Sequence, residues 1–64
     1  MTTPLEELPS IGAPATLALT DAGYTSLAQL AGVARSDLAR LHGVGPRALA
    51  LIEAELEQHD LRLT

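Results

Sequence analysis

The sequence predicts an all-α fold of five helices in a single domain that spans residues 1–64. Two observations lead to this class. Apolar residues recur at the spacing that places them on one face of a helix. Proline, glycine and capping residues divide the chain at the points where helices begin and end. The chain has 64 residues, 47% of them hydrophobic, which suits one small core and leaves no room for a second domain.

The first helix is expected to begin at Pro4 and to end near Leu8. Thr3, Pro4 and Glu6 form the pattern of a capping box, in which a hydroxyl and a carboxylate satisfy the first N–H groups of a helix. Pro9 disfavours helical geometry in the residue before it, so the helix should stop there.

Three further helices are expected between Pro14 and Leu41. The first runs from about Pro14 to Gly23 and the second from Thr25 to Gly32. The third begins at Ala34 or Ser36 and contains Leu38 and Leu41. Gly23 suits the left-handed position that closes many helices. Asp37 falls in the first turn of the fourth helix, where a carboxylate complements the helix dipole.

The longest helix signal runs from Pro46 to about His59, and proline is well suited to its first position. The apolar residues of this helix share one face. One core is expected to contain Leu8, Leu19, Leu30, Leu38, Leu41, Leu49, Ile52 and Leu56. The last segment, 60–64, is expected either to fold back on that core or to fray.

A glycine-bracketed turn between Leu41 and Ala48 precedes this last helix. Two glycines let the backbone reverse, and the first N–H groups of the new helix attract an anion, often a phosphate. A guanidinium beside them can bind phosphate oxygens. The expected phosphate-binding residues are Gly43, Val44, Gly45, Arg47 and Ala48, with His42 and Arg40 as auxiliaries. The alternative is that the two glycines only turn the chain between packed helices.

An internal repeat relates the two halves of the chain at a shift of 33 residues. The matched pairs are Leu8 with Leu41, Ile11 with Val44, Gly12 with Gly45, Ala15 with Ala48, and Leu19 with Ile52. Each half therefore contains a hairpin that leads into a helix. The first hairpin is expected at about 8–23 and the second at about 38–59.

The stretch from Gly43 to Ile52 resembles the helix-hairpin-helix motif, and the doubled pattern resembles a tandem helix-hairpin-helix domain of the SAM-like type. The layout is similar to the C-terminal domain of the bacterial RNA polymerase alpha subunit. This resemblance implies a bacterial protein that binds the DNA backbone, with Gly45, Arg47 and Ala48 at the phosphates. Pro14 and Leu17 occupy positions where that domain has an arginine and an asparagine, so sequence-specific contacts are not expected.

Composition restricts the function further. Eight acidic residues against four arginines give a formal net charge of −4, which opposes long-range steering toward DNA. Glu53 nevertheless lies about 12 Å along the helix from Gly45, which exceeds the screening length of about 8 Å at physiological salt. We therefore expect weak, non-specific DNA binding. The alternative is a protein-interaction or adaptor domain of the same fold that has lost its DNA contacts.

Several other classes are not expected. Cysteine is absent, and His42 and His59 lack a convincing third metal ligand, so no metal site is predicted. The serines and threonines read as caps and turns rather than nucleophiles, so neither an enzyme nor a cofactor is predicted. No apolar run is long enough to span a membrane. A cytoplasmic monomer is the expected form.

Overall fold

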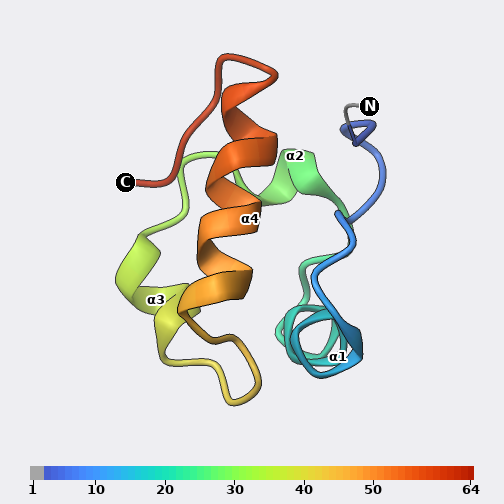
Figure 1. Cartoon of the computed structure of the whole chain (residues 1–64), viewed down its shortest axis with the longest axis vertical. Coiled ribbons are helices and arrows are strands. Elements are labelled where there is room, and N and C mark those ends of the chain that lie inside the picture. Colours follow the sequence, from blue (N-terminus) through green and yellow to red (C-terminus); the bar gives the residue numbers. More distant parts are fainter. Residues whose placement is uncertain (1–2) are drawn as a thin grey trace.

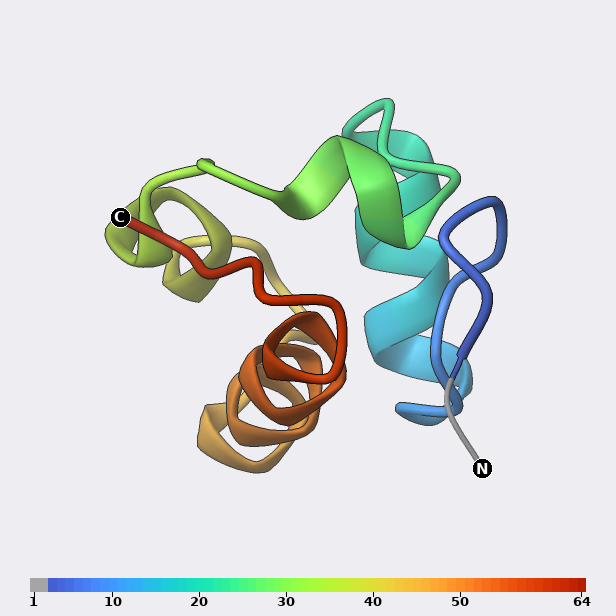
Figure 2. The ribbon, with the colours of Figure 1, turned by 90° about the horizontal axis from the view of Figure 1, so that it is seen from above.

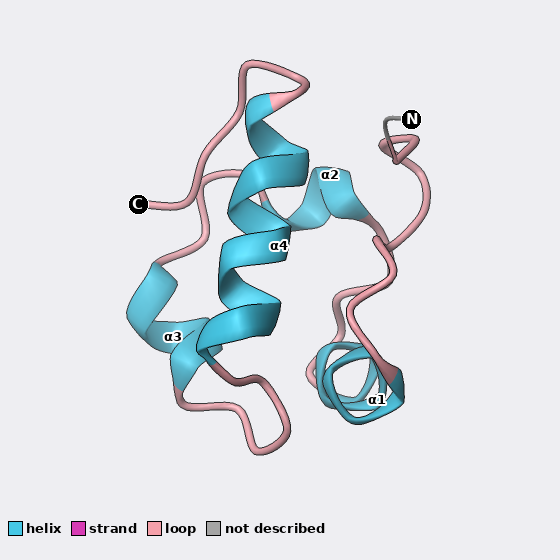
Figure 3. Ribbon diagram, in the orientation of Figure 1, coloured by secondary structure: helices cyan, strands magenta, loops and turns pink. Residues whose placement is uncertain are grey.

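The computed structural model describes residues 3–64 and contains four helices: α1 (Ala13–Asp21), α2 (Leu27–Leu30), α3 (Arg35–Ala39) and α4 (Pro46–Glu57). Figure 3 shows that helices and loops account for this whole described range, without a strand. The predicted all-α class is therefore confirmed. The predicted number of five helices is wrong, because the first expected helix does not form.

The segment expected to be helical from Pro4 to Leu8 is a turn followed by a loop. The Glu7 N–H donates to the Pro4 carbonyl oxygen at 3.1 Å, which closes a single turn. The carbonyl oxygens of Leu5 and Glu7 accept the first two N–H groups of α2, at 2.9 and 2.8 Å. A helix of about one turn has little stability of its own. The contacts with α2 therefore determine the conformation of this segment.

Both polar groups of the Thr3 backbone are bound by residues near the end of the chain. The Thr3 N–H donates to Oε1 of Glu55 at 2.8 Å. Nε2 of His59 lies 2.7 Å from the Thr3 carbonyl oxygen, and it must carry the hydrogen because a carbonyl only accepts. The expected capping box requires the Thr3 N–H to pair with Glu6. In the structure this N–H pairs with Glu55 instead. These two bonds hold the N-terminal segment against α4.

The bond between Glu55 and Thr3 makes this attachment sensitive to acid. Donation from the Thr3 side chain and the Thr3 N–H holds the pKa of Glu55 below its ordinary value, and nearby His59 adds to the effect. A carboxylate with a lowered pKa in the folded state stabilises that state above its unfolded pKa of about 4.3 and loses this contribution as the pH falls further. We expect the Thr3 amide resonance to shift through this acid range in the wild type but not in Glu55→Gln. Equal pH dependence in both proteins would show that the carboxylate does not hold the segment.

The two longest helices end in the same way. At the end of α1 the Tyr24 N–H donates to the Leu19 carbonyl oxygen at 2.8 Å, and Gly23 has φ +97. This is a Schellman motif, and it confirms the predicted left-handed position of Gly23. At the end of α4 the same position is taken by Asp60, with φ +58. Asparagine and aspartate are among the few residues other than glycine that adopt this conformation.

One cluster of buried side chains lies between the helices. It contains Ala15, Leu19, Leu27, Leu30, Leu38, Val44, Ala48, Leu49, Ile52, Leu56 and Leu63. Six of the eight predicted core residues belong to it. The other two, Leu8 and Leu41, are only half-buried and pack against its edge because they lie in the segments that lead into the hairpins.

The helices surround this core. In Figure 1, α4 stands upright near the centre, and α1 lies beside its lower part and is seen end-on. Seen along α4, the short helix α2 connects the α1 side to the α3 side (Figure 2). The Cα radius of gyration is 10.2 Å, which matches the value of about 10.7 Å expected for a compact chain of this length. The chain is therefore a compact helical structure.

The C-terminal segment folds back rather than frays. The Gly32 N–H donates to the Arg62 carbonyl oxygen, and the Thr64 N–H donates to the Val33 carbonyl oxygen, each at 2.9 Å. Leu63 is buried in the core between these bonds. The last segment therefore ties the link between α2 and α3 to the end of α4.

Candidate nucleic-acid interface

The second half of the chain forms a hairpin between two helices. After α3, the Leu41 N–H donates to the Leu38 carbonyl oxygen and the Val44 N–H to the Leu41 carbonyl oxygen, both at 3.1 Å. These two turns reverse the chain before α4 begins at Pro46. Proline at this position has no N–H to leave unpaired, and the predicted beginning of the helix at Pro46 is confirmed. The turn thus leads directly into the first residue of α4.

The two glycines of the hairpin have different roles. Gly43 has φ +100, and a Cβ there would lie 2.8 Å from the Pro14 carbonyl oxygen. Gly45 has φ −96 and ψ 178, which any residue adopts, and a Cβ there would meet no atom within 4 Å. The turn therefore requires glycine at Gly43 only. Gly45 has no side chain, so the beginning of α4 stays open to an approaching group.

The beginnings of α1 and α4 lack the groups that usually cap a helix. Their N-cap residues, Gly12 and Gly45, provide no side-chain hydrogen bond, and neither first turn contains an acidic residue. The first internal bond of α4 is from the Leu49 N–H to the Gly45 carbonyl oxygen, at 3.0 Å. The N–H groups of Arg47 and Ala48 therefore remain without an intrahelical acceptor. By contrast, α2 is capped by the N-terminal segment and α3 carries Asp37.

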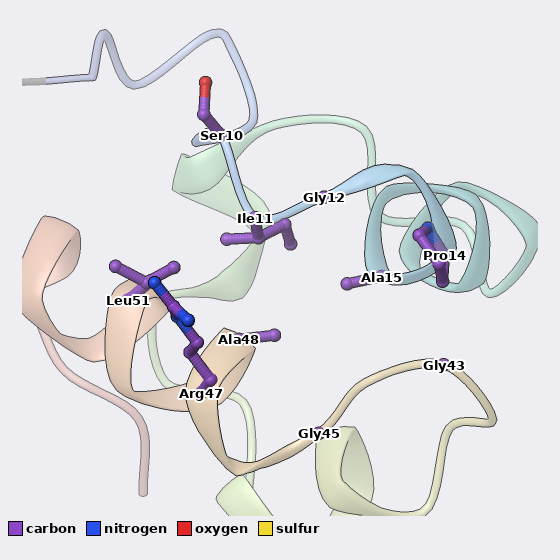
Figure 4. Close-up of a pocket in the computed structure, with 10 residues that line it drawn as sticks. All are labelled: Ser10, Ile11, Gly12, Pro14, Ala15, Gly43, Gly45, Arg47, Ala48 and Leu51. Carbon is purple, nitrogen blue, oxygen red and sulfur yellow. The ribbon is translucent and has the colours of Figure 1, made fainter.

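A cleft of about 430 Å³ lies between the two hairpins. Its lining residues come from both halves of the chain: Ser10, Ile11, Gly12, Pro14, Ala15, Gly43, Gly45, Arg47, Ala48 and Leu51. Figure 4 shows Ala15 and Ala48 pointing toward each other across it, with Arg47 extending beside Leu51. Arg47 is the only charged residue in this lining. In an acidic chain, the cleft thus combines one cation with the positive ends of two helix dipoles.

The other arginines lie outside this lining. Nε of Arg35 lies 3.3 Å from Oε1 of Glu53, and no other ion pair occurs within residues 3–64. Arg47 and Arg40 are exposed, and so is His42 in the turn. The hairpin therefore presents two unpaired guanidinium groups and one imidazole to solvent.

Two of the predicted site residues have buried side chains. Val44 is 6% exposed and its N–H is already bonded to Leu41, so it anchors the turn in the core and offers a ligand no donor. Ala48 is 7% exposed, which leaves its backbone N–H as the group that could bind. Of these two predicted residues, only Ala48 keeps a backbone N–H without an acceptor in the hairpin.

The first hairpin contributes a wall of the cleft that the predicted site did not include. Residues 8–12 form a loop with no helix before them in the described chain, so this half lacks the first helix of the motif. The repeat still places Gly12 and Gly45 at equivalent positions, each the N-cap of its helix. The shift of 33 residues was the signal that could have identified this second wall.

Comparisons with protein-family models, with curated protein sequences and with solved structures found no match to this chain. Within residues 3–64, no helix is both long enough and apolar enough to cross a membrane. The same range contains no group of three or more histidine or acidic side chains that could hold a metal ion.

Proposed function

We propose that this chain is a helix-hairpin-helix module that binds DNA backbone phosphates through its second hairpin, weakly and without strong sequence specificity. The observation that carries the proposal is the uncapped beginning of α4 beside the cleft. The N–H groups of Arg47 and Ala48 have no intrahelical acceptor, and the Arg47 guanidinium is free to bind phosphate oxygens. The open position of Gly45 supports close approach of a phosphate to this backbone.

The distribution of charge is compatible with this function. Glu53 is paired with Arg35, and the remaining carboxylates of α4 lie in its second half or beyond. At about 1.5 Å per residue, Glu53 is about 12 Å from Gly45, further than the screening length of about 8 Å. The net charge of −4 therefore lowers the affinity for DNA and the rate of association. It has less effect on the contact between the hairpin and a phosphate.

The proposal is tested by titrating labelled duplex and single-stranded DNA with the protein at several salt concentrations, starting at about 50 mM. We expect weak binding that varies little with sequence, with a log–log salt slope of about −2 to −3 for two or three phosphates. Absence of binding by the folded protein at the lowest salt concentration would overturn the proposal.

A second candidate function is protein binding. Leu17 and Leu51 are large apolar residues on the surface, 63% and 40% exposed, and Leu51 lines the cleft. Apolar groups at such positions suit a protein partner better than a phosphate. Failure of the DNA titration would favour this adaptor function. Under either function we propose a monomer in the bacterial cytoplasm, without catalytic activity or a cofactor.

A further inference from the structure

The turn of the second hairpin lies directly on the first turn of α1 (Figure 4). A Cβ on Gly43 would be 2.8 Å from the carbonyl oxygen and 3.2 Å from the carbonyl carbon of Pro14, and 3.6 Å from the Cβ of Ala18. Carbon and oxygen atoms that are not bonded approach to about 3.3 Å at the closest. The two hairpins therefore touch through their backbones, and only glycine permits this contact.

We propose, on the basis of the function proposed above, that Gly43 is a positioning residue that fixes the two hairpins relative to each other, so that both walls of the cleft contact the same nucleic-acid ligand. The contact joins the turn of one hairpin to the helix that follows the other. The Pro14 ring fixes its own φ, and its carbonyl oxygen belongs to the regular backbone of α1. Neither side of the contact can therefore rotate away as a flexible side chain would.

Two glycine variants separate this role from ordinary backbone strain. Gly43 and Gly23 have nearly the same φ, +100 and +97, so alanine is strained at both positions. A Cβ on Gly23 meets no atom within 4 Å, whereas one on Gly43 meets the backbone of Pro14. Gly23→Ala is thus a matched control that adds the strain without moving the hairpins apart.

The test compares DNA binding by the wild type, Gly43→Ala and Gly23→Ala across a range of salt concentrations, with the folded fraction measured by circular dichroism. We expect Gly43→Ala to lower the affinity about tenfold, which corresponds to the loss of one charge-assisted hydrogen bond. The salt slope should become shallower by about one unit, because it counts the phosphates contacted. Partial unfolding alone reduces the amount of active protein and leaves this slope unchanged. Gly23→Ala should therefore keep the wild-type slope.

A second variant covers the case in which Gly43→Ala does not fold. Ala18→Leu enlarges the other side of the same contact on the regular backbone of α1, without a positive φ. It should reduce the salt slope in the same way. If Gly43→Ala folds, a salt slope equal to that of the wild type overturns the positioning role. If only Ala18→Leu folds, a wild-type salt slope in that variant overturns it. Lack of binding by the wild type itself would instead overturn the proposed function.

Discussion

Replacing Ile52 with alanine is expected to lower the free energy of unfolding by about 2 to 5 kcal/mol. Ile52 is fully buried on the inner face of α4, where it lies in the same cluster as Leu19, its partner in the repeat. Truncation removes apolar contacts and leaves a cavity that the helices fill only partly. A chain of 64 residues has a total stability of about 3 to 10 kcal/mol at about 0.05 to 0.15 kcal/mol per residue. The variant should therefore be largely destabilised, which urea unfolding followed by circular dichroism would measure.

Leu17→Ala provides the control for this experiment. Leu17 lies on a helix but is 63% exposed, so its truncation should change the free energy of unfolding by no more than about 0.5 kcal/mol. The two variants remove aliphatic side chains of the same size and differ in burial. Similar urea midpoints for Ile52→Ala and Leu17→Ala would contradict the assignment of the core.

The parts of the fold that were predictable from the sequence are those determined by neighbouring residues. Pro46 marks the beginning of α4 and Gly23 the end of α1, because proline and glycine restrict or extend the local backbone conformations. The face of α4 that carries Ile52 and Leu56 follows from the period of the helix alone. These local preferences are seen in the folded chain because the tertiary contacts favour the same backbone conformations.

The N-terminal segment was not predictable because its contacts come from distant residues. Thr3, Pro4 and Glu6 carry a valid local signal for a helix, but α2 needs acceptors for its first N–H groups and takes them from Leu5 and Glu7. The attachment of Thr3 to Glu55 and His59 spans more than 50 residues of sequence. No local pattern contains this information, so the capping signal was overruled by tertiary structure.

The turn before α4 was predictable from the sequence, but the different conformations of its two glycines were not. The sequence pattern treats Gly43 and Gly45 alike, whereas the structure gives one a positive φ against α1 and the other an ordinary extended conformation. Gly45 was expected to be needed for the turn, and this expectation is wrong. The distinction depends on how the two hairpins pack against each other, which the spacing of residues within one hairpin does not determine.

Replacing Arg47 with alanine is expected to have the largest effect on DNA binding among changes that preserve the fold. Arg47 is exposed, has no ion-pair partner within residues 3–64, and is the only charged residue that lines the cleft. Its loss should lower the affinity for every sequence alike, by about tenfold or more if a charge-assisted phosphate contact is removed. The salt slope should become shallower by about one unit. Titration of the same labelled duplexes used for the wild type measures both quantities.

Arg62→Ala is the matched control, because it removes the same charge from a different place. Arg62 is exposed in the C-terminal segment and lines a separate groove beside Glu57 and Leu63, on which the proposed phosphate contact does not depend. Any effect of net charge alone should be equal in the two variants, whereas a phosphate contact at the hairpin should be lost only in Arg47→Ala. Equal affinities and slopes for the two variants would show that binding reflects overall charge. An unchanged titration for Arg47→Ala would rule out the hairpin as the phosphate site and leave the exposed Leu17 and Leu51 as the groups through which the chain acts.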